Sequence, residues 1–151
     1  MKKISIVSIL VIIIDRILKI FVEKFFVQGV RNTVIPNFFY LTFCKNTGAA
    51  FSILKGKTFL LILVAIICLY LIAYTLRKKS ILTKMDIISY GLLVGGILGN
   101  LIDRINYGYV IDYLDFTFYN IGFAIFNFAD MAIVIGAILI ILFSKGSEQV
   151  E

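Results

Sequence analysis

The 151-residue sequence contains no histidine and only two cysteines. Without histidine there is no Ser-His or Cys-His catalytic pair, and the common zinc sites are also excluded. Cys68 lies in an uncharged apolar run and Cys44 in a segment between two such runs, so a disulfide between them is not expected. We predict two free, buried thiols.

Charged residues are also scarce, at 16% of the chain, whereas 61% of the residues are hydrophobic. Soluble domains are about 45–50% apolar, so this composition indicates an α-helical integral membrane protein. Four apolar runs, residues 4–22, 58–76, 87–102 and 123–143, predict four transmembrane helices in a single domain spanning residues 1–151. The second run has 19 residues without a charge, close to the ~20 that cross a bilayer. No small-residue cleavage site follows the first run, which we therefore interpret as an uncleaved span.

The net charge of +6 comes from basic residues at the ends of these runs rather than from a basic patch. Lys2, Lys3, the segment 77–84 and Lys145 all fall on one side of a four-span topology. That side is predicted to be cytoplasmic, with both termini on it. This pattern is typical of a multi-pass membrane protein and argues against a nucleic-acid partner.

Two segments are predicted to lie outside. Residues 25–57 are rich in strand-forming residues and include the only proline, Pro36, so a small extracytoplasmic β-sheet is expected there. Residues 105–122 are crowded with tyrosine and phenylalanine, which favour the membrane interface, and predict an interfacial loop. In the third run, Gly91, Gly95 and Gly99 are spaced for close helix packing.

Several polar residues interrupt the apolar runs or follow them closely. An ionisable side chain in the hydrocarbon costs roughly 2.5–3.5 kcal/mol on insertion scales, so such residues are candidates for function. A spacing of three puts Asn100 and Asp103 on one helix face, and does the same for Asn127 and Asp130. In the predicted topology, Asp112 and Asp130 meet just beneath the outer membrane surface.

Two neighbouring carboxylates tend to share one proton, because like charges resist double ionisation. The ionised carboxylate takes a proton from water, and the protonated one donates a hydrogen bond to a carbonyl. Such a pair hydrolyses a peptide bond without a covalent intermediate, which suits a chain without histidine.

Most of these residues also have a structural interpretation. Asp15 and Lys19 form an i, i+4 pair, Asp103 and Arg104 an ion pair at a helix end, and residues 46–48 a turn. Asp115 is expected to be solvated. Asp130 is the hardest to explain in this way, because its run offers no basic partner.

Four blocks taken together resemble the lipoprotein signal peptidase (signal peptidase II) family. They are NTGAAF at 46–51, GNLIDR at 99–104, GYVIDY at 108–113 and FNFAD at 126–130, and Asp15 in the first span also fits. The resemblance covers nearly the whole chain. Two motifs depart from the usual pattern of the family: Asp15-Arg16 stands where the family has Asp-Gln, and Ile111-Asp112-Tyr113 stands where it has Val-Asp-Phe.

The resemblance implies an aspartyl endopeptidase of the bacterial cytoplasmic (inner) membrane, with its active site near the outer leaflet. The substrate would be a prolipoprotein whose future N-terminal cysteine carries diacylglycerol, cut before that cysteine. Asp112 and Asp130 match the catalytic pair. The residues that match the family's supporting and substrate-binding positions are Asn46, Gly48, Asn100, Asp103, Arg104, Asn127 and Asp15. A monomer in contact with membrane lipids, without metal or cofactor, is expected.

Other functions stay open at this point. The main alternative is a small ion-coupled transporter or channel subunit, which would distribute its carboxylates along the bilayer depth. A Ser-Lys peptidase would use Ser52 and Lys55, but a lysine in a loop is a poor base. The Gly-x-Gly-Asp tetrad of another class of intramembrane protease does not occur, and a non-catalytic scaffold leaves the polar cluster without a purpose.

Overall fold

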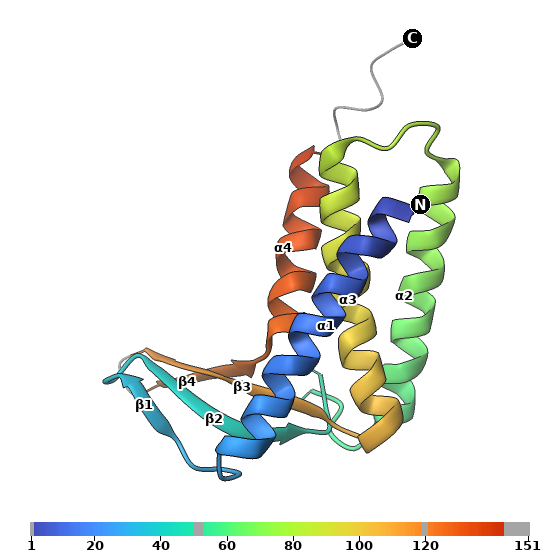
Figure 1. The fold of residues 1–151 in the computed structure, drawn as a ribbon. Coiled ribbons are helices and arrows are strands. Elements are labelled where there is room, and N and C mark those ends of the chain that lie inside the picture. Colours follow the sequence, from blue (N-terminus) through green and yellow to red (C-terminus); the bar gives the residue numbers. More distant parts are fainter. Residues whose placement is uncertain (1, 50–52, 119–120, 144–151) are drawn as a thin grey trace.

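The computed structural model describes residues 2–49, 53–118 and 121–143. In this part of the chain, four helices stand on one side of a four-stranded antiparallel sheet (Figure 1). The elements in chain order are α1 (Lys2–Phe25), β1 (Asn32–Ile35), β2 (Phe39–Asn46), α2 (Thr58–Lys78), α3 (Lys84–Tyr107), β3 (Val110–Phe118), β4 (Ile121–Phe126) and α4 (Phe128–Phe143). Ala50, Phe51, Ser52 and Lys145, which entered the predictions above, lie outside the described residues.

The sheet lies at one end of the helices, and the start of α1 and the end of α4 lie at the other (Figure 1). The connection between α2 and α3 is also at this second end, which we call the terminal end. The helices expose apolar side chains and bury polar ones. In α1, for example, Ile6 and Ile17 are exposed, whereas Asp15 and Lys19 are buried. This inverted pattern is what a lipid environment favours.

The prediction of four helices and a small sheet is confirmed. The prediction that the helices cross a membrane is supported for two of the four helices in the described part of the chain. Within the described ranges, α2 and α3 are long and apolar enough to cross a membrane. Helix α4 is apolar but has only 16 residues. Helix α1 has 24 residues and carries charged residues at its centre.

Glycines bring α3 close to its neighbours, as the sequence predicts. A Cβ atom on Gly91 would lie 2.5 Å from the Val7 Cβ of α1, and one on Gly99 would lie 2.8 Å from the Asp15 carboxylate. Gly96 faces the backbone of α4 at Ala129. Small residues at these positions allow the helix backbones to approach, and they bring α1 and α4 together around α3.

Two boundary predictions are wrong. Residues 105–122 are not an interfacial loop, since α3 continues to Tyr107 and β3 follows from Val110. The fourth helix begins at Phe128 and not at residue 123, because residues 121–126 pair with β3 as strand β4. The sheet therefore takes β3 from the segment expected to be a loop, and most of β4 from the start of the run expected to be the fourth helix.

The sheet has the order β1-β2-β3-β4, so β3 pairs on both sides. In its register with β2, Cys44 lies opposite Asp112. Side chains from α1 (Val22), β2 (Phe43) and β3 (Ile111, Tyr113) form a buried cluster that fixes the sheet to the helices. This cluster places the middle of β3 beside the start of α4.

Asp115 on β3 is not solvated, in contrast to the prediction. It is 1% exposed, and the Arg31 guanidinium donates to both of its carboxylate oxygens, from Nε at 2.6 Å and Nη2 at 3.1 Å. A two-pronged contact of this kind is geometrically specific. It ties the segment before β1 to the central strand β3.

Candidate active site

Side chains from three parts of the chain accept hydrogen bonds from the first turn of α4. The backbone N–H groups at the start of a helix have no partner within the helix. Here the N–H of Phe128 donates to the Tyr113 hydroxyl (3.1 Å), that of Ala129 to the Asp15 carboxylate (3.1 Å), and that of Asp130 to the Asn127 side-chain oxygen (2.9 Å). Side chains from β3 and α1, together with Asn127 itself, thus fix the orientation of this turn.

Asn127 precedes α4 rather than lying within it, so the predicted shared helix face with Asp130 is replaced by a cap. The Asn127 backbone N–H donates back to the Asp130 carboxylate at 3.2 Å, which completes a reciprocal capping arrangement. This explains why an amide and a carboxylate interrupt an apolar run: they mark the place where strand β4 ends and helix α4 begins.

Asp112 lies on β3 and is 2% exposed. Both of its carboxylate oxygens accept hydrogen bonds from asparagine amides. Asn127 Nδ2 donates to one oxygen at 2.7 Å, and Asn46 Nδ2 donates to the other at 2.8 Å. Because one amide comes from β2 and the other from the junction of β4 and α4, the plane of the carboxylate is fixed.

Asp130 is held in the same way but keeps partial access to the surface. Asn100 Nδ2 on α3 donates to it at 2.7 Å, and Asn127 Nδ2 donates to the Asn100 side-chain oxygen at 3.1 Å. Asn127 therefore contacts both carboxylates, through its side chain to Asp112 and through its backbone to Asp130. The two carboxylates line one pocket of about 210 Å³.

The burial of Asp112 raises its pKa to about 7, and the negative charge of Asp130 contributes to the same shift. The hydrogen bonds from Asn46 and Asn127 and the charge of Lys19 oppose the shift. A carboxyl group with a pKa near 7 retains a proton in a large fraction of molecules at neutral pH. The pair is thus suited to carry one proton.

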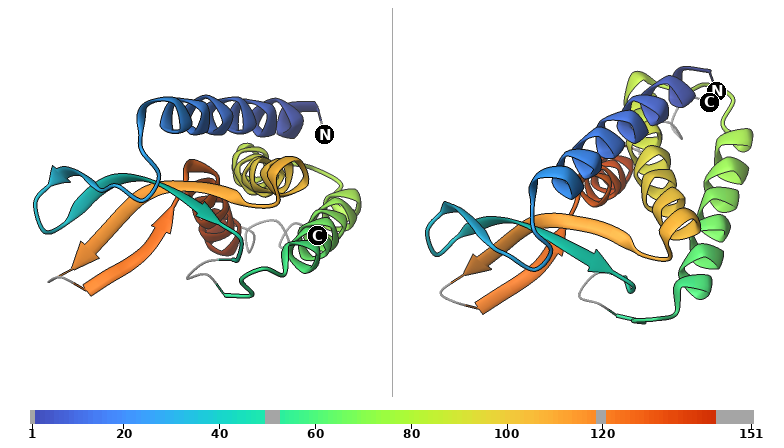
Figure 2. Two further views of the ribbon diagram at one scale, coloured as in Figure 1. Left: turned by 90° about the horizontal axis from the view of Figure 1, so that it is seen from below. Right: turned by 60° about the horizontal axis from the view of Figure 1, so that its bottom comes forward.

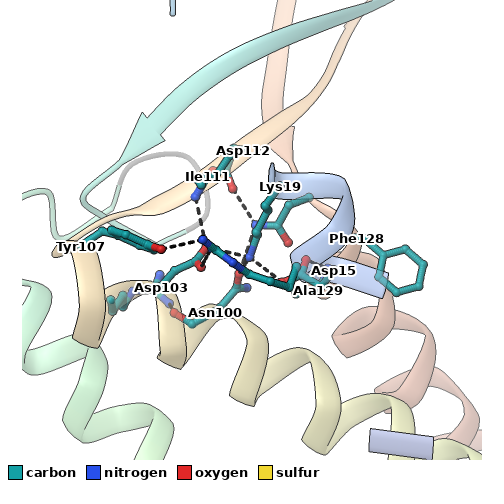
Figure 3. A network of polar contacts seen from close by, with 12 residues as sticks. Asp15, Lys19, Asn100, Asp103, Tyr107, Ile111, Asp112, Phe128 and Ala129 are labelled. Atoms are coloured by element: carbon teal, nitrogen blue, oxygen red, sulfur yellow. Dashed lines mark hydrogen bonds and ion pairs between the residues drawn. The ribbon is translucent and has the colours of Figure 1, made fainter. Parts of the chain in front are cut away.

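Lys19 is the cation at the centre of the network, and its side chain is fully buried (Figure 3). Its Nζ lies 2.7 Å from Asp15, 2.8 Å from Asp103 and 3.1 Å from the Asn100 side-chain oxygen. The predicted pairing with Asp15 is confirmed. Its contacts with Asp103 and Asn100 of α3 could not be predicted from the sequence. Lys19 is therefore the main residue missing from the predicted site.

The predicted ion pair between Asp103 and Arg104 is not among the contacts of the described residues. Asp103 instead contacts Lys19 and Arg16, the latter at 3.4 Å, and accepts from the backbone N–H of Ile111. Arg16 also donates to the Tyr107 hydroxyl at 2.5 Å. Neighbouring residues on a helix point to different sides, so Asp103 turns inward to α1 and Arg104 turns toward the pocket.

Arg104 holds the turn that follows β2. Its Nη2 donates to the Gly48 carbonyl oxygen at 3.0 Å, and the Gly48 N–H donates to the Asn46 side-chain oxygen at 2.8 Å. The predicted turn at residues 46–48 is therefore present, and it orients the Asn46 amide toward Asp112.

The nine predicted site residues form one connected network once Lys19 is included. They are Asp15, Asn46, Gly48, Asn100, Asp103, Arg104, Asp112, Asn127 and Asp130. The pocket that contains the two carboxylates also has an apolar wall, which includes Ile133 and Val134 of α4. A second pocket of about 320 Å³ shares Asn46 and Asp112 with it and extends to Cys44.

Comparison with known proteins identifies relatives over nearly the full chain. The family model described as "Signal peptidase (SPase) II" matches residues 7–145. A lipoprotein signal peptidase from Halothermothrix orenii is 40% identical over 146 residues, covering 96% of this chain and 97% of that protein. One from Desulfitobacterium hafniense is 44% identical over 129 residues, covering 85% of this chain and 83% of that protein.

Solved structures give the same result for the fold. A bacterial membrane enzyme superimposes with a TM-score of 0.85 at 32% sequence identity, covering 100% of this chain and 93% of the other. A second bacterial membrane enzyme structure gives a TM-score of 0.83, also at 32% identity, and covers 99% and 96% of the two chains.

Proposed function

The chain belongs to the signal peptidase II family and is a lipoprotein-processing protease, and we propose that Asp112 and Asp130 are its catalytic carboxylates. The observation that carries this proposal is the shared pocket: both carboxylates line it, and Asn127 contacts both of them. The aspartic type of chemistry also fits a sequence without histidine.

The substrate is a prolipoprotein, and the cut falls before the cysteine that carries diacylglycerol. One proton is shared by the pair. The ionised carboxylate takes a proton from a water molecule, whose oxygen attacks the scissile carbonyl carbon, while the protonated carboxyl group donates to the carbonyl oxygen. Collapse of the tetrahedral intermediate breaks the C–N bond, and the leaving amine takes up a proton from the pair. The reaction needs no covalent intermediate.

The supporting residues hold this pair in position. Asn46, Asn100 and Asn127 donate to the carboxylates, and Arg104 with Gly48 fixes the turn that carries Asn46. Lys19, Asp15 and Asp103 join α1 to α3 behind the pair. Groups held in this way need little reorganisation when charge develops in the transition state, which lowers the barrier.

We place the protein in the bacterial cytoplasmic membrane as a single four-span domain, a monomer with both termini cytoplasmic. Basic residues at the terminal end of the helices support this orientation: Lys2, Lys3, Arg77, Lys78, Lys79 and Lys84. The sheet and the pocket then lie near the outer leaflet. There the acyl chains of the substrate stay in lipid beside the apolar wall of the pocket, and the scissile bond reaches water. That no metal or cofactor is needed stays a prediction.

An ion-coupled transporter or channel subunit has no support. A conduction path requires polar groups along the depth of the bilayer. Asp15, Asp103, Asp112 and Asp130 instead belong to one network at the sheet end of the helices, where they are joined by Lys19 and the asparagines.

The test is cleavage of a diacylglyceryl-modified prolipoprotein peptide by purified variants. Asp112→Asn and Asp130→Asn should each reduce the rate by about 10³-fold or more, because either change removes one of the two acid-base groups. The double variant should be no slower than the slower single variant, since the two groups act as a unit. Glu23→Gln is the matched control, as Glu23 lies on α1 and does not line the pocket.

Folded Asp112→Asn or Asp130→Asn protein that cuts at the wild-type rate would contradict the assignment of the pair. Equal cleavage of a peptide without the diacylglyceryl group would contradict only the lipid requirement. The two parts of the proposal are therefore tested separately by the same assay.

A further inference from the structure

Helix α2 is attached to the other helices in a different way from α1 and α4. The glycines of α3 face α1 and α4, and these three helices approach closely. In α2 the buried residues are Leu61 and Leu76, one near each end. In the view from the sheet end, α2 stands to one side of the other three helices (Figure 2).

The attachments of α2 are likewise at its ends. Near the sheet, the Thr58 hydroxyl donates to the carbonyl oxygen of Gly108 at 2.9 Å. At the terminal end, Leu76 belongs to a buried cluster with Ile4 and Tyr90. Between these points, the middle of α2 lacks the close contacts that glycines provide elsewhere.

A groove of about 270 Å³ lies between α1, α2 and α3, next to the cluster at the terminal end. Its lining is almost entirely apolar and includes Ile9 and Ile12 of α1, Leu69 and Ala73 of α2, and Leu98 of α3. The Ser8 hydroxyl also borders it, but this group already donates within the protein. Methylene groups suit such a lining.

The depth of the groove fits one leaflet. Its α1 residues run from Ile4 to Ile12, which corresponds to about 12 Å at ~1.5 Å per residue. The hydrocarbon core is about 30 Å thick, so the groove covers nearly the half next to the terminal end. An acyl chain in it would place its headgroup at that end.

The rim of the groove at the terminal end is strongly basic. Lys2, Lys3, Arg77 and Lys84 are exposed there, and none of them has an ion pair among the described residues. Within residues 2–49, 53–118 and 121–143, the acidic residue at this end is Asp86, and it is already paired with Lys79 at 2.5 Å and caps α3 through Thr83. The charge of the rim is therefore complementary to an anionic headgroup.

We propose that this groove binds an acyl chain of an anionic phospholipid, whose phosphate contacts the basic residues around the terminal end. The bound chain fills the space that α2 leaves open and so completes the packing of α2 on α1 and α3. The proposal goes beyond the peptidase activity and rests only on the proposed membrane orientation.

The absence of tryptophan makes a direct test possible, since a single introduced tryptophan is the only one in the protein. Leu69→Trp places the fluorophore in the groove. Leu71→Trp is the matched control, because Leu71 is 54% exposed on the same helix. Each variant is reconstituted in phosphatidylcholine vesicles that contain increasing fractions of phosphatidylglycerol or phosphatidylcholine with brominated acyl chains, which quench tryptophan on contact.

For Leu69→Trp, brominated phosphatidylglycerol should reach half-maximal quenching at a mole fraction at least threefold lower than brominated phosphatidylcholine. For Leu71→Trp, the two lipids should quench equally. Adding Lys3→Gln and Lys84→Gln to Leu69→Trp should remove the preference. Equal quenching by both lipids in Leu69→Trp, or no quenching by either, would overturn the proposal.

A second measurement needs no substitution in the groove. It tests the proposed lipid site even if Leu69→Trp does not fold. Phosphatidylglycerol added to wild-type protein in detergent should raise the midpoint of thermal unfolding more than phosphatidylcholine does. The Lys3→Gln, Lys84→Gln variant should lose this difference. Equal midpoints with the two lipids in wild-type protein would refute the lipid site. Neither readout depends on cleavage, so this site and the catalytic pair can fail independently.

Discussion

Asn127 and Asp130 cap one another at the start of α4: the Asp130 N–H donates to the Asn127 side chain at 2.9 Å, and the Asn127 N–H donates to the Asp130 carboxylate at 3.2 Å. The same Asn127 side chain donates to Asp112 at 2.7 Å. One asparagine thus begins a helix, orients one carboxylate through its backbone and orients the other through its amide.

These two roles of Asn127 can be separated. Asn127→Ala should lose both the cap and the contact with Asp112, lowering the free energy of unfolding by about 1 kcal/mol and the cleavage rate by about 10²-fold. Asn127→Ser should keep the cap, because a serine hydroxyl accepts from the N–H of Asp130, but should not recover the rate. Thermal unfolding and peptide cleavage measure the two effects. A serine variant with full activity would show that the amide contact is dispensable.

The pH dependence of cleavage should follow the proton on the carboxylate pair. Burial and the charge of Asp130 raise the pKa of Asp112 to about 7, so the rate should fall as the pH rises through this value and the last proton leaves. Asn46→Ala removes a hydrogen bond that favours the ionised form and so raises the pKa of Asp112 further. The falling limb should then move upward by about 0.5–1 pH unit.

The control for this shift is Asn32→Ala, because the Asn32 side chain donates only to backbone carbonyl groups at an exposed position. Its pH profile should match that of wild-type protein. A shift of the Asn46→Ala limb to lower pH would contradict the sign of the argument.

Loss of the buried cation should destabilise the protein strongly. Lys19→Met leaves Asp15 and Asp103 buried without their closest positive charge, and removing one partner of a buried pair costs about 3–5 kcal/mol. Lys24→Met, on the exposed side of the same helix, should change the free energy of unfolding by no more than about 0.5 kcal/mol. Denaturation of the detergent-solubilised variants tests this, and equal stability of the two would argue against the central place of Lys19.

The arginine at position 16, where the family usually has glutamine, should matter little. Its side chain is 32% exposed, and ion pairs near a surface contribute about 0–1 kcal/mol. Asp103 keeps its contact with Lys19 in Arg16→Gln. The cleavage rate should therefore stay within about fivefold of wild type. A loss of 10²-fold or more would assign Arg16 a direct part in the reaction.

Cys44 offers a way to block the site chemically. It lies opposite Asp112 in the sheet and lines the adjoining pocket of about 320 Å³. Burial and the nearby charges of Asp112 and Asp115 raise the pKa of its thiol, so it should react with a methanethiosulfonate reagent mainly at alkaline pH. A bulky adduct should abolish cleavage. Cys44→Ser should be resistant and Cys68→Ser should remain sensitive; the reverse pattern would place the effect on α2.

The helices could largely be predicted from the sequence, because long apolar runs and their charged ends are local signals. The start of α4 could not be predicted, because apolar residues continue from β4 into the helix. The spacing of apolar residues does not distinguish a short strand from a helix in such a run. The signal that was available is Asn127 followed three residues later by Asp130, which is a helix-start pattern. Similarly, residues 110–117 on β3 do not alternate between apolar and polar, so the usual signal of a half-buried strand is missing there.

The site residues could be predicted, but their partners only in part. Asp15 and Lys19 are four residues apart, so their contact is local and is confirmed. Asp115 and Arg31 are separated by 84 positions, and their pairing depends on the register of the sheet. Such non-local contacts decide which charges are buried, and a single sequence does not encode them in any local pattern.

Asp15 accepts its hydrogen bond from Ala129, 114 positions later in the chain. At a synthesis rate of about 5–20 residues per second, the ribosome needs about 10 s to make the intervening length. During that interval the nascent chain contains α1 but not α4, and Asp130 has not been made. A chain released before residue 130 therefore lacks one of the two proposed catalytic carboxylates and should be inactive.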